Sequence, residues 1–99
     1  MDIVGYDKVI KFIRKYPDSK KSLNTWFQIA SKAKWGNLVE VRQSYPHADL
    51  YLCCTIFNIR GNNYRLIALI NYRTQGIQIQ QILTHAEYDK DKWKKDCET

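Results

Sequence analysis

The middle of this chain lacks acidic side chains. No Asp or Glu occurs from Leu50 to Ala86, although the whole chain has 10 of them. Magnesium and calcium sites are built from carboxylate oxygens, and magnesium-dependent hydrolysis depends on such sites. The absence argues against metal-assisted chemistry in this segment, and we expect the protein to use no metal and no other cofactor.

Cysteines are also few. The chain has three, two of them adjacent at Cys53 and Cys54, and no CxxC spacing. An odd count without that spacing predicts neither a disulfide framework nor a zinc or redox motif. We therefore expect a reduced protein in which Cys53 and Cys54 act as small apolar residues on alternate faces of a strand.

Long apolar runs are missing as well. None approaches the roughly 18 residues that a membrane-spanning helix needs. The first residues, MDIVGYDK, do not place a basic stretch before an apolar one, which a signal peptide would require. We expect a cytoplasmic protein with no membrane partner.

What the sequence does contain is enough for one folded domain over residues 1–99. It is 44% hydrophobic and 13% aromatic, which excludes an intrinsically disordered chain, and a chain of this length can bury roughly 65% of its surface. Its 16 Lys and Arg against 10 Asp and Glu leave a net charge of +6. Such a surplus suggests a polyanionic partner, most often nucleic acid.

Most of that surplus lies at the N-terminus, where residues 1–35 carry eight basic and three acidic side chains. Apolar residues recur there at helical spacing on both sides of Pro17, which predicts two helices. Asp18 or Ser19 is suited to cap the second of them. The face opposite the core would carry Lys8, Lys11 and Lys15. We favour a solvated surface over a phosphate-binding one for this face.

Three later segments predict strands. Residues 50–59, 64–72 and 77–83 are rich in β-branched and aromatic side chains, and Gly- and Asn-containing loops separate them. A turn that pairs Arg60 with Asn63 sets Phe57 opposite Leu66. A second turn that pairs Tyr72 with Ile77 sets Leu66 opposite Leu83, and Arg65 opposite Thr84. An apolar face through Phe57, Leu66 and Leu83 supports these registers.

A helix should follow the third strand, because Thr84 and Glu87 have the spacing of a capping box. His85 then opens the helix, where backbone N–H groups favour an anion. Tyr88 lies one turn further on the same face, and Lys92 would continue it. The predicted cluster comprises Asn58, Arg65, His85, Tyr88 and Lys92, with Arg60 and Arg73 at the two loop ends.

Such a cluster suits cleavage of RNA by its own 2′-OH. That reaction needs a base for the hydroxyl, a cation for the developing phosphorane charge and an acid for the leaving 5′-oxygen. His85 is suited to act as the general base, and Arg65 is suited to supply the cation. Tyr88 can hold the hydroxyl, act as the acid or stack on a nucleobase. Each residue also has a purely structural interpretation, as a hydrogen-bonded histidine, a strand-end arginine and a packing tyrosine. His47 lies in a turn, and we assign it no role.

Two segments resemble a known family. FNIRGNNYRLI (residues 57–67) and THAEYDK (residues 84–90) are similar to the hallmark segments of HigB-type toxins of bacterial type II toxin–antitoxin modules. AKWGN (residues 33–37) and YPHAD (residues 45–49) resemble the family too, so the likeness covers roughly the whole chain.

The resemblance implies an α+β, RelE/ParE-like fold. In it an N-terminal helical hairpin packs on a small antiparallel sheet, with a short C-terminal helix and an added N-terminal strand at residues 2–4. It also implies an mRNA interferase that cuts translated messages, typically on the ribosome, and that is neutralised by a helix-turn-helix antitoxin, HigA-like in type. The family's functional positions fall on Arg60, Arg65, His85 and Tyr88.

We therefore expect a metal-independent endoribonuclease, with His85, Arg65 and Tyr88 as catalytic residues and Arg60, Arg73, Lys92 and Asn58 as RNA-binding residues. Two alternatives stay open. One is a non-catalytic nucleic-acid-binding module in which His85 is structural. The other is a toxin of the same fold that acts on a protein target.

Overall fold

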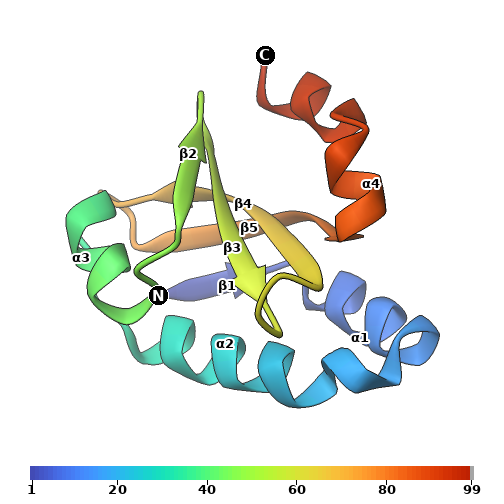
Figure 1. Ribbon diagram of the computed structural model, residues 1–99. Coiled ribbons are helices and arrows are strands. Elements are labelled where there is room, and N and C mark those ends of the chain that lie inside the picture. The colour runs from blue at the N-terminus through green and yellow to red at the C-terminus, as the bar shows by residue number, and fades with distance from the viewer. Residues whose placement is uncertain (99) are drawn as a thin grey trace.

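A computed structural model describes residues 1–98 of the chain as a mixed α+β fold (Figure 1). The five-stranded sheet has the order β1-β5-β4-β3-β2. Its strands are β1 (Asp2–Val4), β2 (Asp49–Tyr51), β3 (Cys54–Ile59), β4 (Tyr64–Asn71) and β5 (Gly76–Thr84). β1 pairs in parallel with β5, and every other pairing is antiparallel. The α+β class and the N-terminal strand are confirmed.

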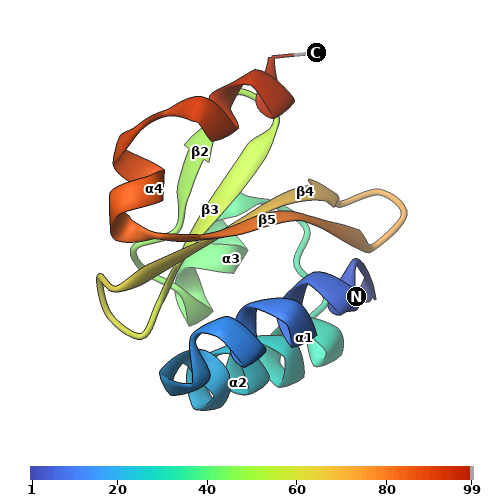
Figure 2. The ribbon, with the colours of Figure 1, turned by 90° about the vertical axis from the view of Figure 1, so that its right-hand side faces the viewer.

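Helices cover both faces of the sheet (Figure 2). One face packs against α1 (Tyr6–Lys15), α2 (Lys20–Lys32) and α3 (Leu38–Ser44). The other carries α4 (His85–Asp89) and the 3-10 helix η2 (Lys92–Cys97). None of the helices in the described part of the chain is long and apolar enough to cross a membrane.

The two N-terminal helices form as predicted, but the predicted cap does not. Leu23, Trp26 and Ala30 are buried on α2, while Lys8, Lys11 and Lys15 are exposed on α1. Residues 17–19 form a short 3-10 turn, and the Ser19 hydroxyl donates to the Tyr16 carbonyl at 2.7 Å instead of capping α2.

Asp18 does not cap α2 either, because its carboxylate is used elsewhere. It accepts a hydrogen bond from the Tyr64 hydroxyl, and it lies 3.3 Å from an Arg60 guanidinium nitrogen. The connection between α1 and α2 is thereby joined to the β3–β4 hairpin.

The first predicted register is confirmed, with Phe57 opposite Leu66 and Asn58 opposite Arg65. The predicted first strand is divided, however. Leu52 and Cys53 make a turn in which Leu52 has a φ of 52°, so β2 and β3 form an antiparallel hairpin rather than one strand.

The second predicted register is wrong. The turn pairs Asn71 with Gly76 instead of Tyr72 with Ile77, and a β-bulge between Ile67 and Ala68 then shifts the pairing by one residue, so that Arg65 lies opposite Leu83. A shift by one residue exchanges the faces of a strand. Leu83 therefore packs with the second core, and Ile82 takes its place beside Leu66 in the first.

The expectation of a reduced chain is also wrong in this structure, because Cys54 is joined to Cys97 by a disulfide. The C-terminal segment folds back over the sheet, which brings the two Cα atoms to 5.6 Å from each other although they are 43 positions apart in the sequence. Ile56, Ile67 and Trp93 surround the bond in a second buried cluster. Cys53 is free and exposed in the β2–β3 turn. The expectation that Cys53 and Cys54 act as small apolar residues of one strand is therefore wrong, since one lies in a turn and the other forms a disulfide.

Candidate functional site

The β3–β4 hairpin loop and the start of α4 meet at one end of the sheet. The backbone N–H of His85 donates to the Asn63 carbonyl at 3.0 Å. One residue earlier in that loop, the Asn62 side-chain oxygen accepts from the Arg65 guanidinium at 3.2 Å. The loop thus connects the first residue of α4 to the arginine on β4, which the sequence analysis placed in one cluster.

Arg65 is a nearly buried cation. Only 8% of its surface is exposed, and it donates to the Asn62 side chain and to its neighbour's carbonyl at Tyr64, at 3.1 Å. No carboxylate among residues 1–98 lies within ion-pairing distance of it. A guanidinium has five N–H donors, and a buried charge is costly without an opposite charge. Arg65 is therefore equipped to bind an anion such as phosphate in a bidentate manner.

Tyr88 lies between that cation and an indole ring. Its ring centroid is 5.2 Å from the Arg65 guanidinium carbon, and it stacks on Trp93 at 5.1 Å between ring centroids. The Trp93 indole N–H donates to the Tyr88 carbonyl, which holds the stack against α4. Burial raises the pKa of Tyr88, although the charge of Arg65 opposes the shift. Near neutral pH the side chain is accordingly a phenol, a proton donor rather than a base.

His85 is the first residue of α4, as predicted. Thr84 and Glu87 make the capping box in both directions, with the Glu87 N–H donating to the Thr84 hydroxyl at 3.2 Å. Nδ1 of His85 lies 2.8 Å from an Asp89 carboxylate oxygen, and both side chains are half-exposed. A carboxylate on Nδ1 fixes the ring and leaves Nε2 to accept a proton from solvent or substrate.

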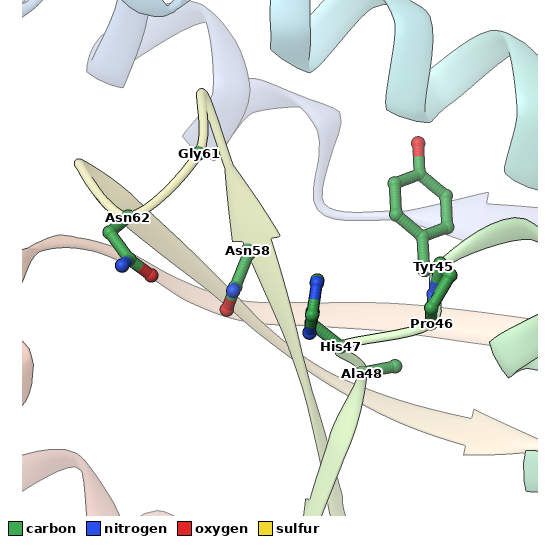
Figure 3. A pocket seen from close by; sticks show the side chains of 7 residues that line it. All are labelled: Tyr45, Pro46, His47, Ala48, Asn58, Gly61 and Asn62. Carbon is green, nitrogen blue, oxygen red and sulfur yellow. The ribbon is translucent and has the colours of Figure 1, made fainter.

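A pocket of about 460 Å³ opens between the α3–β2 turn and the β3–β4 loop. Two of its lining residues adjoin Arg65, since the Asn62 oxygen accepts from the guanidinium and Asn58 lies opposite Arg65 in the β3–β4 pairing. Asn58, Gly61 and Asn62 line one side, and the other is lined by Tyr45, Pro46, His47 and Ala48 (Figure 3). Figure 3 shows the side chains of Asn62, Asn58 and His47 in a row along it. Asn58, a predicted RNA-binding residue, therefore lines this pocket.

His47 was assigned no role from the sequence. Asp49 pairs with Ile56 in the β2–β3 hairpin, and extending that register by two residues puts position 47 opposite Asn58. The β2–β3 turn at residues 52–53 is the signal that could have found it, but the apolar run over residues 50–59 predicted a single strand there.

Three predicted residues lie apart from this cluster. Arg60 is paired with Asp18 at 3.3 Å, toward the α1–α2 connection. Arg73 follows the far end of β4, on the order of 20 Å from Arg65 at about 3.3 Å per strand residue.

Lys92 does not share a helix face with His85 and Tyr88, because α4 ends at Asp89. Asp91 then has a φ of 61°, and Lys92 begins η2. That predicted placement is wrong.

Residues 1–98 contain no group of three His, Cys, Asp or Glu side chains arranged to hold a metal ion. The arrangement of Arg65, Tyr88 and His85 consists of a cation, a phenol and an imidazole, which are suited to acid–base chemistry on an anionic substrate.

The family model of the HigB toxin, a RelE-like toxic component of a toxin-antitoxin system, matches residues 19–91, which include Arg65, His85, Tyr88 and the residues that line the pocket. The chain belongs to the HigB toxin family. This membership confirms the resemblance drawn from the motifs at residues 57–67 and 84–90.

Individual HigB proteins are similar over most of their length. The chain is 30% identical over 93 residues to the mRNA interferase HigB of Escherichia coli O6:H1, which covers 91% of this chain and 90% of that protein. It is 27% identical over 78 residues to the mRNA interferase toxin HigB of Escherichia coli K12 and to the mRNA interferase HigB of Shigella flexneri. Each of these matches covers 76% of this chain and 75% of the relative.

Proposed function

We propose that this HigB-family chain is a metal-independent endoribonuclease that cleaves mRNA, as the names of its relatives suggest. The observation that carries the proposal is Arg65, a nearly buried cation with no carboxylate partner among the described residues, held between the Tyr88 ring and the Asn62 amide. Phosphate is the anion that an RNA substrate would supply to it.

In the proposed reaction the 2′-OH of one nucleotide attacks the adjacent phosphorus. The O2′–P bond forms and the P–O5′ bond breaks, which leaves a 2′,3′-cyclic phosphate and a 5′-hydroxyl. Nε2 of His85 takes the proton of the 2′-OH, since Asp89 holds the opposite ring nitrogen. Arg65 stabilises the phosphorane charge, and the Tyr88 phenol gives its proton to the leaving oxygen.

The proposed setting is translated mRNA on the ribosome, in the cytoplasm. The basic side chains of α1 and α2 are exposed and would attract a polyanion, an effect that falls as salt rises. The toxin–antitoxin description of the family implies an antitoxin partner, and we propose a HigA-like helix-turn-helix protein for it.

Transcript mapping after induced expression tests the proposal. Wild-type expression should produce internal cuts in messages, and Arg65→Ala and His85→Ala should abolish them with the fold intact by circular dichroism. Gln78→Ala is the control, because it removes an exposed polar side chain at the other end of β5 from His85 and should leave cleavage unchanged.

Two outcomes would contradict the proposed ribonuclease activity. Growth arrest with intact messages would point to a toxin with a protein target. An unchanged phenotype and unchanged RNA binding in His85→Ala would point to the non-catalytic binding module.

A further inference from the structure

The pocket beside Arg65 contains hydrogen-bonding groups that the protein itself does not use. Arg65 has only donors, so the Asn62 oxygen must face it, and the Asn62 NH₂ group is left free. Within residues 1–98, the Asn58 amide and the His47 imidazole make no side-chain hydrogen bond, although Asn58 is half-buried. A half-buried amide without a partner, flanked by the exposed side chains of Asn62 and His47, is suited to a ligand that supplies both donors and acceptors.

The pocket is uncharged, unlike the neighbouring Arg65. No Lys, Arg, Asp or Glu lines it, whereas Arg65 next to it is a cation. A volume of about 460 Å³ lies within the range of roughly 300–1,000 Å³ that is usual for small-ligand sites. The pocket is therefore suited to an uncharged, hydrogen-bonding group attached to a phosphate that Arg65 holds.

We propose that this pocket binds the nucleobase next to the scissile phosphate, and that the side chains of Asn58, Asn62 and His47 read its edge. Amide side chains recognise bases through paired donors and acceptors, and an imidazole can hydrogen-bond to or stack on a base. The inference rests on the proposed function, because the base belongs to the RNA whose phosphate Arg65 binds. In this proposal, His47 and Asn58 determine which base the pocket accepts.

Binding can be tested without any cleavage. The labelled protein is titrated with each of the four ribonucleoside 5′-monophosphates and, separately, with ribose 5-phosphate, while NMR follows the side-chain signals of His47, Asn58 and Asn62. We expect these signals to shift with at least one nucleotide and not with ribose 5-phosphate. His47→Ala should weaken that nucleotide about fivefold or more, and because His47 is exposed, its removal leaves the core intact.

Gln78→Ala is the matched control, since Gln78 is an exposed polar residue that lines a different pocket at the other end of β5; nucleotide affinity should be unchanged. Equal shifts with ribose 5-phosphate, or no shift at the three side chains, would overturn the base pocket even if the protein cleaves RNA.

Cut-site sequences give a second readout. Wild-type cuts should favour one base beside the cleaved bond, and His47→Ala and Asn58→Ala should flatten that preference by about fivefold to 150-fold. An unchanged preference in both variants would overturn the proposal. If nucleotides shift these side-chain signals but the wild-type protein cuts no RNA, the proposed ribonuclease activity is wrong and the proposed nucleobase pocket is supported.

Discussion

The guanidinium of Arg65 lies over the ring of Tyr88, with its central carbon 5.2 Å from the ring centroid. The contact joins β4 to α4, and the same ring stacks on Trp93. Tyr88 thus has a structural role through its ring and, in the proposed reaction, a chemical role through its hydroxyl.

These two roles can be separated at Tyr88. Tyr88→Phe keeps the ring between Arg65 and Trp93 and removes only the proton donor, so single-turnover cleavage should fall about 10²- to 10⁴-fold while the melting temperature stays within about 2 °C of wild type. Tyr88→Ala should lose cleavage and stability together. A fully active Phe variant would exclude the phenol as the acid.

Asp89 should act through His85. Asp89→Asn removes the charge that holds the imidazole and should slow cleavage about tenfold to 100-fold, by analogy with partners that orient a histidine. Asp91→Asn is the control, because Asp91 pairs with Lys94 at 3.3 Å and lies outside the site. Equal rates for the two variants would mean that the His85–Asp89 pair does not orient the base.

Removal of metal ions should not stop the reaction. No metal takes part in the proposed steps, so cleavage should persist at the same rate in excess EDTA. With ribosomes in the assay, their integrity is checked by sedimentation in parallel. If the protein stops cleaving in EDTA while the ribosomes stay intact, and added magnesium restores cleavage, the metal-free mechanism is refuted.

The pH dependence of stability should include Tyr45. Burial raises its pKa from 10.0 to about 12. Below pH 10 both states keep the proton, and between pH 10 and 12 the unfolded chain loses it first, so the free energy of unfolding falls as the pH rises.

The Tyr45 contribution is limited by solvent. Two pKa units correspond to at most about 2.7 kcal/mol, and partial exposure reduces this to about 1 kcal/mol. Tyr45→Phe keeps the edge-on packing against Phe57 and should lose about 1 kcal/mol less than wild type between pH 8 and pH 11.5, measured by urea unfolding. Equal losses would show that Tyr45 does not titrate abnormally.

The Cys54–Cys97 disulfide should stabilise the fold by restricting the unfolded chain. With the two cysteines 43 positions apart in the sequence, reduction or Cys97→Ser should lower the free energy of unfolding by about 2–4 kcal/mol. Cys53→Ser is the control and should change it little, because Cys53 is free and exposed. Equal stability with and without a reductant would show that the bond does not form in solution.

Local interactions explain what sequence analysis predicted correctly. The capping box at Thr84 and Glu87 and the first hairpin around residues 60–63 each depend on residues a few positions apart. These two features placed His85 and Arg65, and the alternation along β3 and β4 placed Asn58 opposite Arg65. The helical spacing around Pro17 likewise predicted α1 and α2.

The failures have a different origin, because each depends on contacts between distant segments. The bulge between Ile67 and Ala68 exchanged the faces of Ile82 and Leu83, and no local pattern in residues 76–84 marks it. Lys92 was extrapolated along a helix that stops at Asp89.

The sequence by itself determined α1, α2, the β3–β4 hairpin, the helix start at His85 and the cation–imidazole–phenol set, since capping, turn formation and side-chain alternation act over a few residues. Only the tertiary structure decided the disulfide, the stack of Arg65, Tyr88 and Trp93, and the pocket that includes His47. Each of these requires segments far apart in the chain to pack against one sheet, and their contacts depend on the exact register of β4 and β5 and on where α4 ends.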